Sequence, residues 1–353
     1  MRSSAHADPI ASSDAAKRIA ICAKVWRPNG DDYGDRRMMP TDQALGRPLS
    51  YAQNMEDYHL DVAFGGARQG RYVDIGGGHP VAGSVTFWFY QRGWSGIVVE
   101  PQPALAALHR RLRPRDTLVE AVIGRSSGET DFFKIDRLHG LSTTVRGNAE
   151  AAGVHGVGFE TMKLPSISLA DLCRTHEIDK VDFLKIDVEG AERDVLEGAD
   201  WSTYRPRIVM LEAVTPLANA PAWSDWEPLL LENNYQFALF DTLNRFYVAA
   251  ECADILERMP RERAPWDAVT HMYEIGRAPE NSSHPDFALA QELARGFWAS
   301  LPLLDEQIQA MLLARARDCK GAEREALDEY VRSEAFLAAL GRIACTYDGG
   351  HIP

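Results

Sequence analysis

Residues 71–101, RYVDIGGGHPVAGSVTFWFYQRGWSGIVVEP, decide the fold. A short apolar run at residues 72–75 is suited to a strand buried on both faces, and the three glycines at 76–78 let the backbone turn sharply and approach a ligand. A helix at residues 85–90 then leads to a second apolar strand that ends at Glu100. A carboxylate at that place can accept hydrogen bonds from both hydroxyls of a ribose. The stretch therefore predicts a pocket for a nucleotide-type cofactor.

Asp74, just before the glycine turn, helps to choose between classes of cofactor. The pattern GxGxxG fails because Val81 stands where the third glycine would be, so the phosphate-binding fingerprint of a dinucleotide enzyme is incomplete. An acid at this place would repel a pyrophosphate, but it suits a cofactor that carries an ammonium group, such as S-adenosylmethionine. An ordinary turn of three glycines remains an alternative.

The composition limits the possible functions. With a formal net charge of -13 over 353 residues, nucleic acid is not expected as a partner. The five cysteines are scattered and form no CxxC pair, so neither a disulfide framework nor a zinc site is indicated. The N-terminus lacks the apolar core of a signal peptide, and no stretch is apolar for long enough to span a membrane. We expect a cytoplasmic protein without membrane insertion.

The chain divides into three predicted parts. Residues 1–47 are rich in Ser, Ala, Asp, Arg and Pro, which indicates a partly disordered N-terminal arm. Residues 48–280 form the main domain, and residues 281–353 form a helical C-terminal extension. Residues 287–345 indicate three helices, of which the last has one apolar stripe. The stripe consists of Leu327, Tyr330, Val331, Leu337 and Leu340.

Strands and helices alternate through the main domain, which predicts an α/β fold with a mostly parallel sheet. Helices are expected at residues 48–64 with Ser50 as N-cap, and at 85–90, 103–112, 169–178, 191–198 and 226–231. Strands are expected at residues 71–75, 97–99, 117–123, 130–135, 181–186, 207–211, 235–240 and 245–249. The last two should pair as an antiparallel hairpin at a sheet edge. Such a sheet resembles the seven-stranded, Rossmann-like class I methyltransferase fold more than that of a dehydrogenase.

Seven motifs, in order, resemble those of the FkbM family of S-adenosylmethionine-dependent methyltransferases. They are SYAQNMEDYHL at 50–60, VDIGGGHP at 73–80, SVTFWFYQRGWSGIVVEP at 84–101, LST at 141–143, FLKIDVEGAERDVLEG at 183–198, EAVTP at 212–216 and DTLNRFYVA at 241–249. The resemblance covers about residues 50–250. It is strongest to members found beside or fused to bacterial glycosyltransferases, which are taken to O-methylate sugars.

The resemblance implies cofactor roles position by position. Asp74 and the glycine turn should face the methionine end of S-adenosylmethionine, Glu100 should hold the ribose, and Ala121 with Val122 should border the adenine. Residues of the preceding helix should close over the cofactor, although a solvated helix face is an alternative for them. The full implied set is Glu56, Asp57, Asp74, Gly76, Gly77, Gly78, Ser84, Glu100, Pro101, Ala121, Val122 and Asp187.

Methyl transfer to a hydroxyl calls for a base near the carboxyl edge of the sheet. Asp187 is the first candidate, Glu189 the second and His79 the third. Together with Glu212, the first two can alternatively share a divalent cation. Each candidate also has a structural alternative, because Asp187 and Glu189 can serve the start of the helix after Gly190, and His79 can cap its own loop.

Further polar residues are expected to bind the acceptor. Ser142 and Thr143, followed by Thr144, should line its pocket, because no His–Asp partner pattern makes them nucleophiles. Asn244 and Arg245 at the hairpin tip are expected to bind sugar hydroxyls, with turn chemistry as the alternative for the asparagine. Glu212 is expected to contact the acceptor or the metal, with a structural role as its alternative.

The leading hypothesis is an S-adenosylmethionine-dependent O-methyltransferase that acts on a sugar or glycan in bacterial polysaccharide biosynthesis. The alternatives are methylation of a non-sugar natural product, a catalytically degenerate fold that serves as partner of a glycosyltransferase, and an NAD-dependent dehydrogenase. The apolar stripe of the C-terminal helices should pack on its own domain, or else form a homodimer contact or a docking face for a glycosyltransferase.

Overall fold

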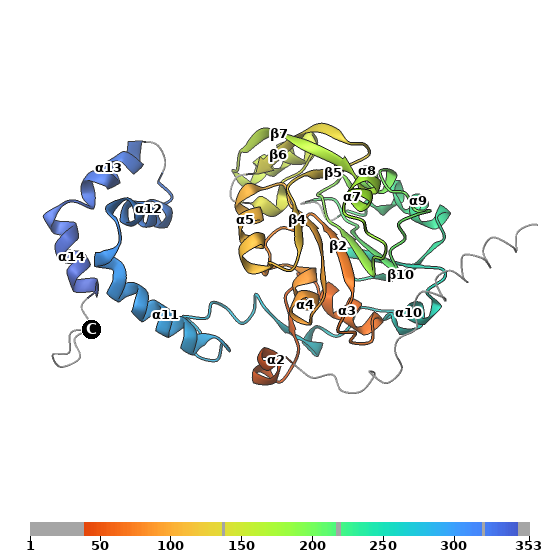
Figure 1. Cartoon of the computed structure of the whole chain (residues 1–353), viewed down its shortest axis with the longest axis horizontal. Coiled ribbons are helices and arrows are strands. Elements are labelled where there is room, and N and C mark those ends of the chain that lie inside the picture. Colours follow the sequence, from red (N-terminus) through yellow and green to blue (C-terminus); the bar gives the residue numbers. More distant parts are fainter. Residues whose placement is uncertain (1–38, 136–137, 217–219, 320–321, 345–353) are drawn as a thin grey trace, which may run out of the picture. The chain divides into compact units, whose positions relative to one another are not determined.

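The computed structural model describes residues 39–135, 138–216, 220–319 and 322–344 (Figure 1). The chain divides into two compact units, with the boundary in the sequence between Glu274 and Ile275. Most of the predicted N-terminal arm lies outside the described residues, and the part that is described includes helix α2, Pro40–Leu45. The predicted domain boundaries at residues 47 and 280 stay predictions.

The first unit is built on a sheet of seven strands in the order β10-β11-β9-β8-β2-β3-β4. The strands from β9 to β4 are parallel, whereas β11 is antiparallel to both of its neighbours. Their bounds are Arg71–Ile75 for β2, Ser95–Val99 for β3, Thr117–Val119 for β4, Phe183–Ile186 for β8, Ile208–Glu212 for β9, Tyr235–Phe240 for β10 and Asn244–Ala249 for β11. This confirms the predicted fold class, including the antiparallel hairpin.

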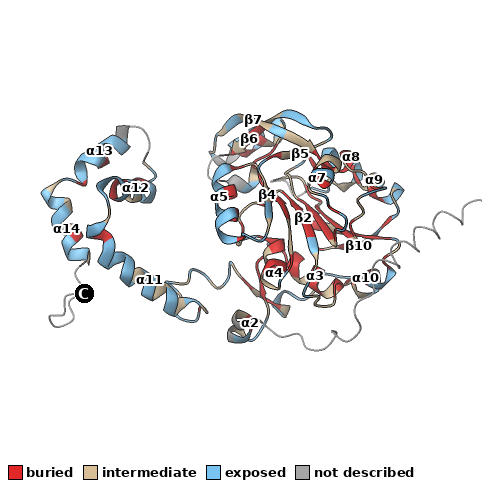
Figure 2. Cartoon of the chain, in the orientation of Figure 1, coloured by how far each residue is buried: buried red, intermediate tan, exposed pale blue. Residues whose placement is uncertain are grey.

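Helices cover both faces of this sheet. Figure 1 shows α3 (Glu56–Ala63), α4 (Val85–Gln91) and α10 (Ala253–Arg258) grouped on one side, and α7 (Leu169–Thr175), α8 (Glu192–Glu197) and α9 (Glu227–Glu232) on the other. Helix α5 (Pro103–Leu112) connects β3 to β4. The buried residues follow the strands and the inward sides of the helices (Figure 2), as expected for a parallel sheet covered on both faces.

A second sheet of three strands lies between β4 and α7 in the chain and is called the insertion here, residues 122–168. Its strands are β5 (Val122–Gly124), β6 (Gly128–Ile135) and β7 (Phe159–Ser168), in the order β5-β7-β6. The insertion also contains η1 (His139–Leu141), α6 (Arg146–Ala151) and η2 (Ala152–His155), and it has a small apolar core of its own.

The structure of this region differs from the prediction in two places. The single strand expected at residues 117–123 is two strands, because the chain leaves one sheet after Val119 and enters the other at Val122. Strand β7 was not predicted at all. Its polar residues and Pro165 conceal the strand pattern. Pro165 is tolerated because β7 has only β6 as a partner there, its pairing with β5 beginning at Ser166.

The start of the helix predicted at residues 48–64, with Ser50 as its N-cap, was also wrong. Residues Leu49–Ser50 form strand β1, which pairs in parallel with β12 (Thr270–His271), and helix α3 begins only at Glu56. The buried Asp57 carboxylate accepts hydrogen bonds from the Ser50 hydroxyl at 2.7 Å and from the Tyr51 N–H at 2.8 Å. These bonds require a loop that folds back over the first turn of the helix.

The second unit is helical. It contains α11 (Phe287–Ser300), η5 (Leu301–Leu303), α12 (Glu306–Arg317), α13 (Ala322–Tyr330) and α14 (Glu334–Ala344). The last predicted helix is therefore two helices, because the chain turns at Ser333, whose hydroxyl accepts the Phe336 N–H. The small apolar core of this second unit consists of Ala310, Ala314, Leu327 and Val331. No helix in the described ranges is long and apolar enough to cross a membrane.

Candidate active site

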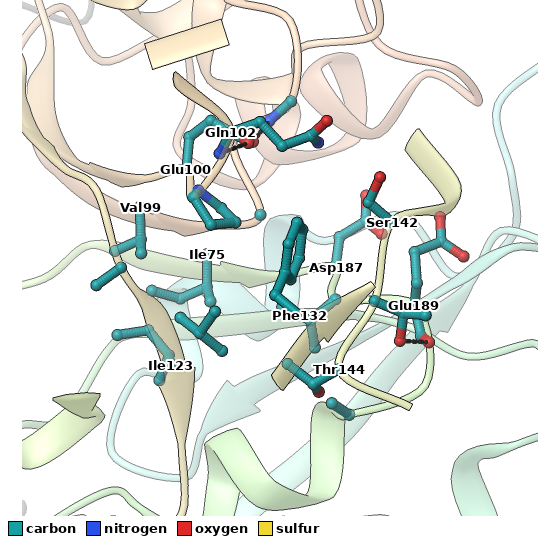
Figure 3. Close-up of a pocket in the computed structure, with 18 of the residues that line it drawn as sticks. Ile75, Val99, Glu100, Gln102, Ile123, Phe132, Ser142, Thr144, Asp187 and Glu189 are labelled. Carbon is teal, nitrogen blue, oxygen red and sulfur yellow. Dashed lines mark hydrogen bonds between the residues drawn. The ribbon is translucent and has the colours of Figure 1, made fainter. Parts of the chain in front are cut away.

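A cavity of about 110 Å³ opens at the carboxyl ends of β2, β3 and β8. The strand ends contribute Ile75, Val99, Glu100 and Asp187, and the insertion contributes Phe132 and a loop at residues 140–144 (Figure 3). Ligands of open α/β sheets bind at this edge. The predicted residues that line the cavity are Gly76, Gly78, Glu100, Pro101, Ala121, Val122, Ser142, Thr143, Asp187 and Glu189.

The glycine turn has a shape that other residues could not adopt without strain. Gly76 and Gly78 have φ values of 78° and 57°, in the left-handed region. A Cβ atom at Gly76 would overlap the backbone carbonyl of Asp187, and one at Gly77 would overlap the Val98 side chain. Three glycines at this point thus let strands β2, β3 and β8 come close together.

Glu100 is held at the end of β3 with acceptor capacity to spare. Its carboxylate accepts hydrogen bonds from the N–H groups of Gly78 and Gln102, both at 2.8 Å. A carboxylate has about four lone-pair sites, so two remain for a ligand. Burial raises the pKa of Glu100 to about 7. This arrangement can bind two neighbouring hydroxyl groups, such as those of a ribose.

Asp74 lies beneath the pocket and does not line it. Its carboxylate accepts the Thr86 hydroxyl at 2.6 Å and lies 3.2 Å from the Lys185 ammonium. The partner of Asp74 is thus a cation of the protein itself. Lys185 also donates to the Gly76 carbonyl oxygen at 2.6 Å and lies 3.3 Å from the Asp187 carboxylate. Sequence reasoning missed Lys185, although a lysine two residues before Asp187 in an apolar strand was a signal.

Three acids meet at the edge of the sheet. Asp187, Glu189 and Glu212 offer carboxylate oxygens that all lie within 4.8 Å of one another. Burial and repulsion from Asp187 raise the pKa of Glu189 to about 9, and burial with repulsion from Asp187 and Glu189 raises that of Glu212 to about 10. The cluster therefore retains protons at neutral pH, or else it can hold a divalent cation.

The backbone of Glu189 is strained and clamped by the insertion. Glu189 has a φ of 56°, which is unusual for a residue with a side chain. Its carbonyl oxygen accepts hydrogen bonds from the Thr143 hydroxyl at 2.9 Å and the Asn148 amide at 2.8 Å. Strain of this kind persists where the surroundings enforce it. Asn148, which sequence reasoning missed, therefore helps to aim Glu189 into the pocket.

The other two residues of the predicted acceptor loop differ in their hydrogen bonding. Ser142 accepts the Ile135 N–H at 3.1 Å, so its oxygen is used within the insertion. Thr144 lines the pocket, and its hydroxyl makes no hydrogen bond within the described part of the chain. Thr144 is the hydroxyl of this loop that is left for a ligand (Figure 3).

His79 and Ser84 lie outside the cavity lining. The Nδ1 atom of His79 accepts the N–H groups of Val81 and Ala82 at 3.1 and 3.0 Å, which matches the alternative that it caps its own loop. Ser84 precedes helix α4 and accepts a hydrogen bond from Arg113 at 3.1 Å.

Glu56, Asp57, Asn244 and Arg245 also lie outside the lining. The buried Glu56 carboxylate accepts the Asn244 amide at 2.7 Å, which ties the start of α3 to the tip of the hairpin. Burial raises the pKa of Glu56 to about 8 and that of Asp57 to about 6. Arg245 stacks on Trp223 and Phe237 and donates to Glu227. In the structure Glu56, Asn244 and Arg245 support the hairpin, whereas Asp57 holds the loop that precedes α3.

The fold and the pocket together define a class of protein. A parallel sheet that ends in an antiparallel hairpin, a glycine turn after β2 and an acid at the end of β3 are typical of class I methyltransferases. Residues 70–237 match the family model of the methyltransferase FkbM domain. The chain thus contains an FkbM-family, S-adenosylmethionine-dependent methyltransferase domain, and the dehydrogenase alternative is set aside.

Solved structures give remote matches. A TehB-like SAM-dependent methyltransferase from Corynebacterium glutamicum has 9% identity and a TM-score of 0.32, over 66% of this chain and 99% of that one. An O-methyltransferase from Bacillus cereus in complex with SAH has 12% identity and a TM-score of 0.30, over 66% and 97%. Likenesses this remote carry no inference about function. The comparison with curated proteins gives no match.

Proposed function

We propose that this protein transfers a methyl group from S-adenosylmethionine to a hydroxyl of a sugar or glycan. The observation that carries the proposal is the position of Asp187 and Glu189. Both line the same cavity as the glycine turn and Glu100, so a proton acceptor lies beside the groups that suit the cofactor. Free lone pairs on Glu100 and the close glycine turn fit a ligand with a ribose.

The residues assigned to the cofactor come from three strand ends and the insertion. Glu100 would hold the ribose, and the glycine turn would lie against the methionine part. Val99, Ile123 and Phe132 give an apolar slot for the adenine. When bound, the cofactor supplies a methyl carbon on a positively charged sulfur, which is already activated for displacement. The protein therefore has mainly to align the acceptor oxygen, and alignment can contribute about 7–11 kcal/mol.

Asp187 and Glu189 have different roles in the proposed reaction. Asp187 accepts the proton of the acceptor hydroxyl, which can add about 10² to 10⁴ to the rate. Burial and repulsion from Asp187 raise the pKa of Glu189 to about 9, so its carboxyl is protonated at neutral pH and can donate a hydrogen bond to a bound acceptor. Thr144 provides a further hydroxyl to orient the acceptor. Several hydrogen-bonding groups at one pocket suit a ligand with several hydroxyls, and this supports a sugar over an apolar natural product.

The three acids carry a second proposal for the same edge of the sheet. A divalent cation held by Asp187, Glu189 and Glu212 would neutralise their repulsion and would orient a pair of sugar hydroxyls. Titration with Mn²⁺ monitored by electron paramagnetic resonance tests it. Binding by wild type that is lost in Glu212→Gln supports the cation, and free Mn²⁺ at all protein concentrations contradicts it.

We further propose that the reaction takes place in the cytoplasm as a step of bacterial polysaccharide biosynthesis. In this proposal the second unit forms the contact with a second copy of the chain or with a glycosyltransferase. Leu289 and Leu293 of α11 are 56% and 65% exposed, which supports a contact on that helix. Sedimentation of the purified protein, alone and with a candidate glycosyltransferase, measures both possibilities.

The main experiment combines binding and transfer. Titration calorimetry with S-adenosylhomocysteine should show binding, and incubation with labelled S-adenosylmethionine should methylate one class in a panel of glycans. Asp187→Asn should abolish transfer, whereas Asp225→Asn, an exposed acid outside the cavity lining, should not. Lack of binding would exclude the methyltransferase. Binding without transfer to any acceptor would favour the degenerate partner of a glycosyltransferase.

A further inference from the structure

A buried ammonium group lies directly beneath the pocket. The Nζ atom of Lys185 contacts three oxygens from two segments of the chain. From β2 and its turn come Asp74 Oδ1 at 3.2 Å and the Gly76 carbonyl at 2.6 Å, and from the end of β8 comes Asp187 Oδ2 at 3.3 Å. The side chain is only 7% exposed. The Lys185 ammonium donates a hydrogen bond to the Gly76 carbonyl, and its contacts with Asp74 and Asp187 are ion pairs.

The geometry indicates more than neutralisation of a buried acid. The shortest contact of Lys185 is to the carbonyl of the glycine turn, and Asp74 has a second partner in Thr86. Burial alone would lower the pKa of Lys185, but Asp74 and Asp187 raise it above its usual range, so the ammonium stays charged. The Lys185 ammonium therefore contacts the glycine turn and the Asp187 carboxylate at the same time.

Gly76 and Asp187 both line the cavity, although they follow different strands, β2 and β8. Their backbones are close, since the Asp187 N–H donates to the Ile75 carbonyl at 3.0 Å. Lys185 adds a link between the Gly76 carbonyl and the Asp187 carboxylate. If that link is removed, the Gly76 carbonyl and the Asp187 carboxylate are no longer held to one common partner.

We propose that Lys185 is a positioning residue that holds the glycine turn and the Asp187 carboxylate in one arrangement, on which the affinity for the cofactor depends. The inference rests on the proposed function, because it takes S-adenosylmethionine as the ligand. Lys185 acts through its two partners and does not itself line the cavity.

The test separates positioning from charge balance. Lys185→Met leaves two acids without their cation, which should lower the melting temperature. The double variant Asp74→Asn with Lys185→Met removes one of those acids, so its melting temperature should return toward that of wild type. Calorimetry with S-adenosylhomocysteine should show both variants binding about tenfold more weakly than wild type or worse, the effect of one lost charge-assisted hydrogen bond.

Lys163→Met is the matched control, because Lys163 pairs with Asp131 at 2.7 Å on the surface and is 62% exposed. It should bind S-adenosylhomocysteine as wild type does. Wild-type affinity in the double variant would overturn the proposal, since Lys185 would then only balance Asp74. If Lys185→Met does not fold, the double variant alone decides. Absence of binding by wild type would overturn the proposed function, and this inference with it.

Discussion

Glu100 makes cofactor binding depend on pH in a direction that follows from the structure. The residue is only 2% exposed, and burial raises the pKa of its carboxyl from 4.5 to about 7. The ionised form accepts hydrogen bonds from two ribose hydroxyls, so tight binding requires the proton to be lost. Lowering the pH below about 7 should therefore weaken binding, and raising it further above 7 should change little.

The size of the effect follows from the ionised fraction of Glu100. With a pKa of about 7, roughly one molecule in eleven is ionised at pH 6 and roughly ten in eleven at pH 8. The affinity for S-adenosylhomocysteine should then rise about tenfold between these two pH values. Titration calorimetry at pH 6, 7 and 8 measures it.

Glu100→Gln identifies the group responsible. The glutamine oxygen cannot accept both the Gly78 and the Gln102 N–H as well as a ligand, so binding should be weaker at every pH. Because an amide does not titrate, the tenfold rise should disappear. Equal wild-type affinities at pH 6 and 8, or a rise of the same size in Glu100→Gln, would refute the reasoning.

Three further substitutions test the site and its support. Gly76→Ala should lower the free energy of unfolding by at least about 2 kcal/mol in chemical denaturation. The alanine would have to adopt a left-handed conformation, and its Cβ atom would also overlap the Asp187 carbonyl. Arg113→Met should cost about 3–5 kcal/mol in the same assay, since it leaves the buried Asp116 unpaired. Asn148→Ala removes one of the two hydrogen bonds to the Glu189 carbonyl and should slow labelled methyl transfer about tenfold.

Each of these three has a matched control. Gly83 has a φ of 74° but open space around its Cβ position, so Gly83→Ala should cost only about 1 kcal/mol. Arg110 is 57% exposed and pairs with Glu120, so Arg110→Met should lower the free energy of unfolding by less than about 1 kcal/mol. Asn233→Ala removes a bond to the Leu229 carbonyl away from the pocket and should leave transfer unchanged. If a control substitution has as large an effect as the test substitution it is paired with, the structural reason given for that test substitution is contradicted.

The sequence was most informative where its apolar runs were continuous. Strands β2, β3, β8 and β9 are largely buried, and apolar residues make up most of each strand, which made the parallel sheet and its order of elements predictable. The glycine turn and Glu100 followed from the same runs, because each comes directly after a buried strand. Helix α5 was predicted with its bounds as observed.

What could not be predicted depends on pairing between distant segments. Lys185 stands beside Asp74 only because β8 pairs with β2 in a register that the sequence does not state. Asn148 reaches Glu189 because the insertion folds over the carboxyl edge. Ser50 looked like a helix cap, but the Asp57 carboxylate draws it into a loop instead. In each case a polar side chain received its role from a partner far away or from an unexpected turn.

Strand β11 has a consequence for how this protein can be divided. It joins β9 to β10, and five of its residues are in register with β9. A fragment limited to residues 70–237, the family match, would lack β11 and leave the outer edge of β9 without its partner. Such an open, apolar edge recruits strands from other molecules and leads to aggregation. The smallest fragment expected to stay monomeric in solution must therefore extend past Ala249.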